Sequence, residues 1–434
     1  MHEITEEMLN EFSKDVTEDP DIRTLGAALA KTEMKDVSFV PVDAAKLNGE
    51  FSVEVKTRGI TFQQKSGRCW MFSCLNILRE KVAEECHLKE FHLSGNYLAF
   101  YDKLERFNNL LEMAAANADK PLNDRLNSYI LDSFGDGGYW TMDVDLIHKY
   151  GIVPESIMPE TWQSTHTESI DQILQTALRK DIAELRRLSN NGEDVQTAKK
   201  KMLAEVYKAE CIAFGTPVKK FDFSYRDEDE TFHCDYAITP VQFYRKYAEN
   251  ALDNYTVVTN YPVSNRKMNH LISYHYAGSM ANSDILNLNI SIADIEKLCI
   301  KQLQSGEPVW FGCDSRAYGN RSEGVWDPSS FTYSRLLGNI HLEMDKTTRL
   351  ETHDSSATHA MILTGVNLAE NGKPNRWKIE NSWGKEAGKD GYFVCSEEYF
   401  LEYVYEAVIN KKYLNEEQLK MLKQEPIKIE PWEI

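Results

Sequence analysis

Cys69 stands in a sequence context that suits a nucleophile. From Trp70 onward, apolar side chains recur every three or four residues, which predicts an amphipathic helix that begins at Cys69. The free backbone N–H groups and the dipole at a helix N-terminus favour a thiolate over a thiol. Gly67 lets the backbone approach a substrate closely. Free cysteines are commonly inert core residues, so Cys69 by itself would not predict catalysis.

Two further segments, far downstream, carry side chains that could work with a thiolate. His359 lies in the segment Ala357–Leu363, and Asn381 lies in the segment Trp377–Gly384. A lone histidine on an apolar strand is usually a core residue. A cysteine, a histidine and an asparagine that follow in this order instead predict a Cys-His-Asn nucleophilic site.

These segments resemble the papain-like cysteine peptidases. The run from Ser66 to Trp70 is similar to the bleomycin hydrolase and aminopeptidase C branch of those enzymes, and departs from the papain signature at Ser66 and Arg68. Ser66 stands where animal papain-type enzymes carry a disulfide-forming cysteine. Further matches to the branch are Asp136–Trp140, Pro308–Asp314 and Trp432.

The resemblance implies a role for each residue of the site. Cys69 would attack the scissile carbonyl, and His359 would take the thiol proton and then protonate the leaving amine. Asn381 would hold the imidazole through its side-chain oxygen, and Trp383 would cover that contact. Gln63 would donate to the oxyanion together with the Cys69 backbone N–H, and losing such a donor typically costs about 10²–10³ in rate.

The resemblance also implies that Gly137, Gly138 and Trp383 contribute to substrate binding. The two glycines match the pair that hydrogen-bonds an extended substrate backbone in papain-like enzymes. An ordinary turn is the alternative, because Asp-Gly and Gly-Gly dipeptides are common in turns.

The helical and strand-like segments that must position these residues indicate an α+β protein. We expect a papain-like fold with a helical half, a β-barrel-like half and a large, mainly helical insertion. Four regions follow: an N-terminal helical arm (1–50), the helical half with the nucleophile (51–160), the insertion (161–300), and the β-rich half with His359, Asn381 and a C-terminal arm (301–434). Within the first region, Thr5 is expected to cap a helix, and residues 37–40 read as a strand.

The insertion is predicted from spacing. His359 follows Cys69 by roughly 290 residues, whereas compact papain-type enzymes need about 130–150. Apolar periodicity predicts helices from Ile170 to Leu188 and from Val195 to Cys211, joined by a turn at Asn190–Gly192. The apolar stripe of this hairpin could pack on its own domain or on another subunit. The family resemblance implies a homohexamer.

The composition of the chain indicates which binding partners to expect and which cellular compartment. A formal net charge of −19 over 434 residues argues against nucleic acid as a partner. The eight cysteines are scattered without a Cys-x-x-Cys pair, no signal sequence follows Met1, and no run is apolar enough to span a membrane. We therefore expect a soluble, reduced, cytoplasmic protein that acts on oligopeptides without a metal or cofactor.

The C-terminal segment does not decide between aminopeptidase and endopeptidase specificity. In the resembling family, a C-terminal arm lies in the cleft and its carboxylate meets the substrate amine. Here the chain reads Glu430–Ile434, and we expect a short arm that does not reach the nucleophile. The predicted activity is that of an aminopeptidase, with an oligo-endopeptidase as the alternative. An acyltransferase and an inactive binding scaffold are remote alternatives.

Overall fold

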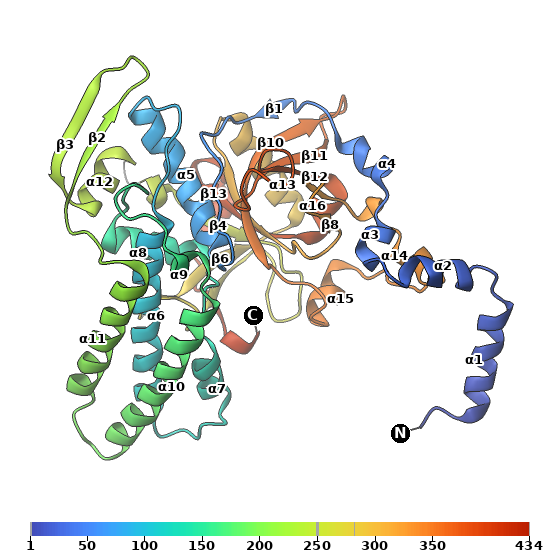
Figure 1. The fold of residues 1–434 in the computed structure, drawn as a ribbon, viewed down its shortest axis with the longest axis horizontal. Coiled ribbons are helices and arrows are strands. Elements are labelled where there is room, and N and C mark those ends of the chain that lie inside the picture. Colours follow the sequence, from blue (N-terminus) through green and yellow to red (C-terminus); the bar gives the residue numbers. More distant parts are fainter. Residues whose placement is uncertain (1, 249–250, 282, 434) are drawn as a thin grey trace.

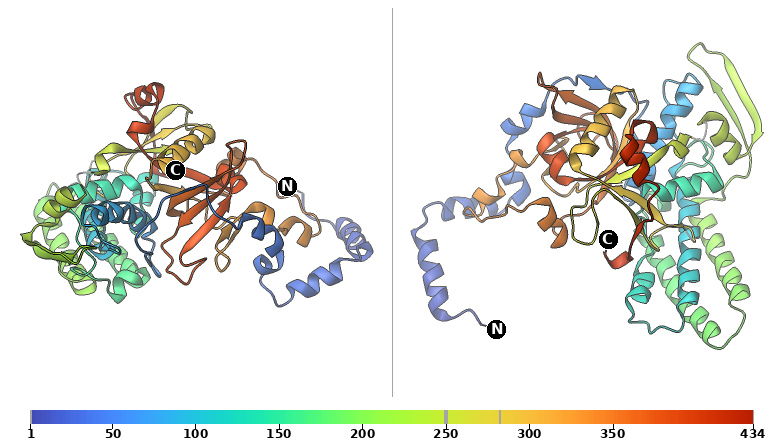
Figure 2. Two further views of the ribbon diagram at one scale, coloured as in Figure 1. Left: turned by 90° about the horizontal axis from the view of Figure 1, so that it is seen from above. Right: turned by 180° about the vertical axis from the view of Figure 1, so that it is seen from behind.

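The structure is a computed structural model that describes residues 2–248, 251–281 and 283–433. A helical part and a β-rich part lie side by side, and an N-terminal arm projects away from both (Figures 1 and 2). This arrangement is an α+β fold in which separate layers supply the residues of the predicted site.

Short helices make up the N-terminal arm: α1 (Glu6–Glu18), α2 (Ile22–Leu29), α3 (Met34–Ser38), α4 (Pro41–Ala44) and the 3₁₀ helix η1 (Ala45–Leu47). Thr5 caps α1 as predicted, since its Oγ1 accepts a hydrogen bond from the Met8 N–H at 3.2 Å. The predicted strand at residues 37–40 is wrong. The chain forms α3 there, and Phe39 makes only an isolated bridge to Phe331, because a contact distant in sequence sets this segment.

Long helices dominate the helical part: α5 (Cys69–Glu85), α6 (Gly95–Ala116), α7 (Arg125–Asp132), α8 (Trp140–Tyr150), α9 (Trp162–Thr165), α10 (Glu168–Asn190) and α11 (Val195–Phe214). The hairpin of α10 and α11 forms where the apolar periodicity predicts it. Leu178 and Ile182 of α10 join one buried cluster with Phe107 and Leu111 of α6. The chain's own helix therefore covers the apolar stripe of α10.

A strand hairpin and one helix, β2 (Phe221–Arg226), β3 (Phe232–Ile238) and α12 (Pro240–Tyr247), follow α11. The 3₁₀ helix η2 (Ala251–Asn254) then leads into the main sheet.

Among the described residues, the main sheet has twelve strands, in the order β14-β5-β6-β4-β13-β7-β10-β11-β12-β9-β8, with β1 paired to β10. The strands are β1 (Val53–Glu54), β4 (Tyr255–Thr259), β5 (His270–Tyr274), β6 (Ile285–Asn289), β7 (Val309–Cys313), β8 (Gly319–Asn320), β9 (Val325–Trp326), β10 (His359–Leu368), β11 (Pro374–Glu380), β12 (Tyr392–Ser396), β13 (Val404–Asn410) and β14 (Ile427–Ile429). Strands β4 to β6 share this sheet with the strands after Pro308. The predicted division at residues 50, 160 and 300 stays a prediction.

Shorter helices accompany the sheet: α13 (Ile292–Gln304), α14 (Tyr333–Leu336), α15 (Lys346–Glu351), α16 (Glu397–Tyr403), α17 (Glu416–Met421), η3 (Pro328–Ser330), η4 (Lys411–Tyr413) and η5 (Pro431–Glu433). The helical part meets the sheet through α5, which packs on β10. Ser73 Oγ of α5 donates to the carbonyl oxygen of Ala360 at 3.0 Å. The helix that begins at Cys69 is thereby tied to the strand that begins at His359.

Candidate active site

Cys69 and His359 line a single cavity of about 600 Å³ between the helical part and the sheet. Cys69 is the first residue of α5, and His359 is the first residue of β10. Gln63, Gly137 and Gly138 line the same cavity. Residues predicted from three distant segments therefore meet in one place.

The His359 ring is held on one edge and on one face. Its Nε2 lies 2.9 Å from Asn381 Oδ1, which also accepts the Ser382 backbone N–H at 2.8 Å. Because a backbone N–H can only donate, this second bond identifies the Asn381 atom as the oxygen. Nε2 of His359 must then carry its proton, which makes Nδ1 the basic nitrogen. Trp383 stacks on the imidazole, with ring centroids 4.7 Å apart, and Arg321 lies over the indole at 4.9 Å.

Burial disfavours the charged forms of both His359 and Cys69. It lowers the pKa of His359 from 6.5 to about 4, although the bond to Asn381 raises it. It also raises the pKa of the Cys69 thiol, against the backbone N–H groups of Ala360, Trp70 and Cys69 itself, which lower it. The helix N-terminus therefore acts in the predicted direction but is outweighed by desolvation. A thiolate and an imidazolium here depend on each other for compensation.

Gln63 is buried and hydrogen-bonded at both ends of its side-chain amide. Its Nε2 donates to the Ser66 carbonyl oxygen at 2.6 Å, and its Oε1 accepts from Ser382 Oγ at 2.6 Å. An amide nitrogen has two N–H groups, so one of them is left for an oxygen in the cavity. The contact with Ser382 also links Gln63 to the residue after Asn381.

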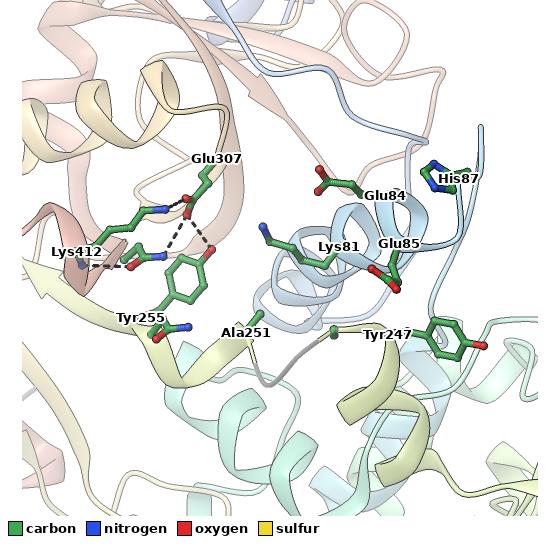
Figure 3. Close-up of a pocket in the computed structure, with 12 residues that line it drawn as sticks. Lys81, Glu84, Glu85, His87, Tyr247, Ala251, Tyr255, Glu307 and Lys412 are labelled. Carbon is green, nitrogen blue, oxygen red and sulfur yellow. Dashed lines mark hydrogen bonds and ion pairs between the residues drawn. The ribbon is translucent and has the colours of Figure 1, made fainter. Parts of the chain in front are cut away.

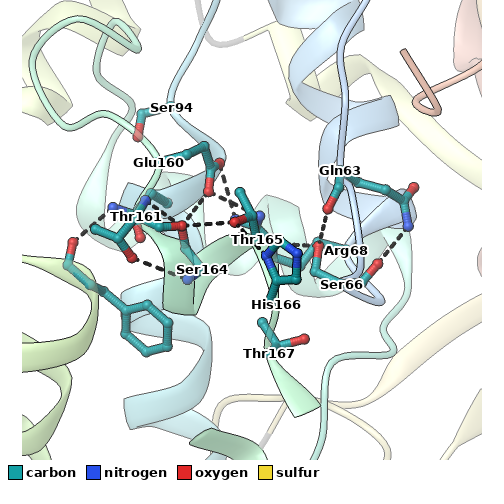
Figure 4. A network of polar contacts seen from close by, with 12 residues as sticks. Gln63, Ser66, Arg68, Ser94, Glu160, Thr161, Ser164, Thr165, His166 and Thr167 are labelled. Atoms are coloured by element: carbon teal, nitrogen blue, oxygen red, sulfur yellow. Dashed lines mark hydrogen bonds and ion pairs between the residues drawn. The ribbon is translucent and has the colours of Figure 1, made fainter. Parts of the chain in front are cut away.

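A buried ion pair anchors the loop that precedes Cys69 (Figure 4). Ser66 Oγ donates to the Gln63 carbonyl oxygen at 2.7 Å and accepts from Arg68 Nε at 3.0 Å. The Arg68 guanidinium, only 2% exposed, binds both carboxylate oxygens of Glu160 at 3.0 and 3.2 Å. Bidentate pairing of this kind fixes direction as well as distance. The contacts of Ser66 and Arg68 in this network explain why serine and arginine stand on either side of Gly67.

Asp136 supports the same loop from the opposite side. Its Oδ2 accepts the Gly67 N–H at 2.8 Å, and its carbonyl oxygen accepts Trp70 Nε1 at 2.8 Å. Lys103 Nζ, which is 1% exposed, lies 2.7 Å from Asp136 Oδ1 and also pairs with Asp171. The Lys103 charge holds the pKa of Asp136 well below its usual range. Asp136 therefore contacts residues on both sides of Cys69, Gly67 through its carboxylate and Trp70 through its backbone carbonyl oxygen.

The two glycines after Asp136 differ in what they require. A Cβ at Gly138 would come within 2.4 Å of the Trp70 ring, so this position must be glycine. Gly137 has open space around its Cα and is exposed on the cavity side. Close packing against Trp70 thus explains one glycine of the predicted pair, and access to the cavity suits the other.

The C-terminal segment reaches this cavity. Pro431 lines it together with Cys69, and Trp432 and Glu433 line an adjoining cavity of about 630 Å³. Arg266 Nη2 donates to the Glu433 carbonyl oxygen at 3.0 Å. Strand pairing of β14 with β5 directs Pro431 into the wall of the cavity, and the expectation that the arm does not reach the nucleophile stays a prediction. Ile434, also part of that expectation, lies outside the described residues.

A separate pocket of about 590 Å³ lies beside the C-terminal end of α5 and contains none of the predicted residues (Figure 3). Glu307 in its wall accepts hydrogen bonds from Tyr255 at 3.2 Å and Asn410 at 3.3 Å, and pairs with Lys412. These contacts give Glu307 a structural role.

Sequence reasoning missed several residues that shape the site, namely Ser73, Lys103, Glu160, Asp171 and Glu406. Trp310, whose Nε1 donates to the Trp70 carbonyl oxygen, was read only as part of a matching motif. Asp136 was read only as part of a matching motif. Each of these side chains acts through a contact between segments far apart in sequence. Ser73 also had a local signal, because its position one helical turn after Cys69 places it near that residue.

Three further observations concern the cysteines, possible metal ligands and the length of the helices. All eight cysteines carry free thiols. In the described ranges, no cluster of three or more histidine, cysteine or acidic side chains is placed to hold a metal ion. The helices in that part of the chain are too short or too polar to cross a membrane.

Comparison with known proteins gives the family. The model of the Peptidase C1-like family matches residues 3–434. Aminopeptidase C of Listeria monocytogenes is 40% identical over 433 residues, covering 99% of this chain and 98% of that protein. Aminopeptidase G of Lactobacillus delbrueckii subsp. lactis is 39% identical over 440 residues, covering 100% and 99%.

A solved structure agrees with these relatives. The crystal structure of PepW from Lactobacillus rhamnosis HN001 matches with a TM-score of 0.96 at 38% identity, covering 99% of this chain and 98% of that one. The chain therefore belongs to the Peptidase C1-like family and is a papain-like cysteine peptidase of the bleomycin hydrolase and aminopeptidase C branch.

Proposed function

We propose that this protein is an aminopeptidase that hydrolyses oligopeptides through Cys69, His359 and Asn381. The observation that carries the proposal is the cavity that Cys69 and His359 share, with the His359 ring oriented by Asn381. The names of the relatives, aminopeptidases C and G, support the amino-terminal specificity.

The proposed reaction has two steps. The Cys69 sulfur attacks the scissile carbonyl while its proton passes to His359 Nδ1, and the amine leaves with that proton, which forms a thioester. Water then attacks the thioester with His359 as base, which releases the acid and restores the thiol. Gln63 Nε2 and the Cys69 N–H stabilise the oxyanion in both steps. Gly137 and Gly138 bind the substrate backbone.

Amino-terminal specificity draws further support from the C-terminal segment. Pro431 lies in the wall of the cavity, and Arg266 holds Glu433 beside it. Chain that occupies one end of a cleft limits how far a peptide can extend there.

The test compares a substrate that has a free α-amine with its N-acetylated form. We expect hydrolysis of the free amine only, and comparable cleavage of both would instead establish an oligo-endopeptidase. Cys69→Ala should abolish hydrolysis of either substrate. Cys234→Ala, which removes a half-buried thiol from β3, should keep full activity. Activity that survives Cys69→Ala would contradict the mechanism.

We also propose a homo-oligomer, a hexamer as the family resemblance implies, in the cytoplasm. The exposed apolar side chains of α1 support assembly, because such a helix gains stability when a partner covers it. Eight unpaired cysteines support a reducing compartment.

A further inference from the structure

The helix that presents Cys69 also carries a buried arginine that contacts the strand before Asn381. Arg79 lies in α5, as Cys69 does, and Glu380 is the last residue of β11. Arg79 Nη2 donates to both carboxylate oxygens of Glu380, at 2.9 and 3.2 Å. This ion pair joins the helix that begins at the proposed nucleophile to the residue directly before Asn381, which contacts His359.

Both partners of the pair are buried, and the arginine is held at several nitrogens. Arg79 and Glu380 are each 1% exposed. Arg79 Nε donates to Glu80 Oε1 at 2.8 Å, and its Nη1 donates to Asn76 Oδ1 at 3.2 Å. Glu80 also accepts the Arg58 backbone N–H at 2.9 Å. Because a guanidinium is planar, contacts at three of its nitrogens fix the direction of the pair as well as its length.

The same helix is tied to a second point after β11. Asn76 Nδ2 donates to Thr61 Oγ1 at 3.1 Å. The Thr61 carbonyl oxygen accepts the Gly384 N–H at 3.0 Å. Asn381 therefore lies in a short segment, between Glu380 and Gly384, whose two ends are both connected to α5.

The charge of the pair points to a role in geometry. Two charges lose their hydration on burial, and well-packed apolar side chains of similar volume are often at least as stabilising. A directional ion pair between two walls of a cleft instead fixes their relative position. A displacement of about 1 Å can cost on the order of 10²-fold in rate, even when its cause lies far from the reacting atoms. Transfer of a proton from Cys69 to His359 depends on that position.

We propose that Arg79 and Glu380 are positioning residues of the proposed reaction. Through the pair, Glu380 holds the adjacent Asn381 and with it the His359 ring. The ring thereby keeps its place relative to Cys69. Neither Arg79 nor Glu380 lines the cavity, so both act through other residues. This inference rests on the proposed peptidase mechanism.

Replacement of both partners by apolar side chains tests the proposal without leaving a charge buried alone. In Arg79→Met/Glu380→Leu, Glu80 keeps its contacts with Arg58. Urea unfolding should give a free energy of unfolding close to that of the wild type. On the free-amine substrate, kcat should fall about 10- to 100-fold while KM changes less than about 3-fold.

Alkylation of Cys69 supplies a readout that folding stability alone does not move. Its reaction with iodoacetamide at a series of pH values, followed by mass spectrometry of the Cys69 peptide, reports the thiolate whether or not peptides are cleaved. In the wild type, a thiolate paired with the His359 imidazolium should react below the pH of about 8.5 at which an ordinary thiol titrates. The double variant should lose about 10-fold of this low-pH rate, because the ring is no longer held in place.

Two further variants serve as controls. Arg79→Lys keeps the charge but loses the planar set of donors, and should lower kcat by only about 3- to 10-fold. Arg349→Met/Glu402→Leu removes another Arg–Glu ion pair, between α15 and α16, and should leave kcat and the alkylation profile unchanged.

A folded double variant with the kcat and alkylation profile of the wild type would overturn the inference, and so would an equal loss in Arg349→Met/Glu402→Leu. If the double variant does not fold, Arg79→Lys decides, and an unchanged kcat in that variant overturns the inference. Failure of the proposed function is seen separately, as a wild-type protein that cleaves no peptide and whose Cys69 reacts as an ordinary thiol.

Discussion

At the scale of single residues, burial disfavours the charged forms of Cys69 and His359, the two reacting groups of the proposed mechanism. Burial lowers the pKa of His359 and raises that of Cys69, so transfer of the thiol proton creates two charges that stabilise each other. Asn381 matters because it engages Nε2 of the ring, which leaves Nδ1 for the proposed transfer of the thiol proton. It also accepts the Ser382 N–H, so its own position is fixed by the backbone.

Asn381→Ala should lower kcat more than it changes KM. The variant leaves Cys69 and His359 in place but frees the imidazole to rotate and to change tautomer, so part of the 10²–10⁴-fold contribution of general acid–base catalysis is lost. Steady-state kinetics on the free-amine substrate measure this. A change in KM alone would show that Asn381 acts on substrate binding instead.

Glu406 predicts a pH dependence of stability. Burial raises its pKa from 4.5 to about 7, while Tyr261 and Arg266, the latter by its charge, oppose the shift, and Tyr139 and Tyr274 also face it. The folded protein therefore keeps a proton that the unfolded chain loses, and this contribution to stability is present below pH 4.5 and lost as the pH rises to 7.

Glu406→Gln removes this dependence. Between pH 4.5 and 8, the free energy of unfolding of the variant should rise relative to the wild type by up to about 3 kcal/mol, since each pKa unit corresponds to about 1.4 kcal/mol. Urea unfolding at a series of pH values measures the difference. Curves that stay parallel would contradict the assigned pKa.

At the scale of elements, the position of Cys69, the proposed nucleophile, depends on how α5, α6 and α10 meet. Lys103 of α6 lies between Asp136, in the loop before α8, and Asp171 of α10. Asp136 in turn binds Gly67, two residues before α5. The position of the nucleophile is therefore tied to helices that contribute no reacting atom.

Lys103→Met should destabilise the protein by about 3–5 kcal/mol, because it leaves two carboxylates buried without their cation. The matched control is Arg179→Met, which breaks a solvent-exposed ion pair between α10 and Asp132 of α7 and should change stability little. Urea unfolding of both variants at pH 7 measures the contrast. Equal effects would mean that burial of the Lys103 pair has no energetic consequence.

At the scale of the whole molecule, the N-terminal arm stands apart from the folded body. Helix α1 projects away from the sheet, and Met8, Leu9, Phe12 and Val16 are 40%, 53%, 48% and 53% exposed (Figure 1). An amphipathic helix with this much exposed apolar surface supports the proposed assembly from several copies of the chain.

Phe12→Glu should reduce the oligomer measured by light scattering, because it places a charge on the apolar side of α1. Thermal stability of the dissociated chain should change little, since Phe12 is half exposed. Val42→Glu, at a 71% exposed apolar residue in α4, is the control and should leave the mass unchanged. An unchanged mass in Phe12→Glu would exclude α1 as an assembly surface.

The sequence by itself determined the features that depend on local pattern and residue type. Apolar periodicity placed α5, α10 and α11. The contexts of Cys69, His359 and Asn381 predicted the family, two residues that share the cavity, and the asparagine that contacts His359. These features are readable because helix periodicity and the chemistry of a nucleophile are carried by neighbouring residues.

Tertiary structure alone decided the features that depend on register and burial. The row from Ala360 through Gly312 to Glu406 exists only once three strands pair, and the charge of Lys103 matters only because two distant aspartates are buried beside it. The path of Pro431 into the cleft follows from the pairing of β14 with β5. No single stretch of sequence contains these relations, because a side chain's pKa and partners are set by segments that folding brings to it.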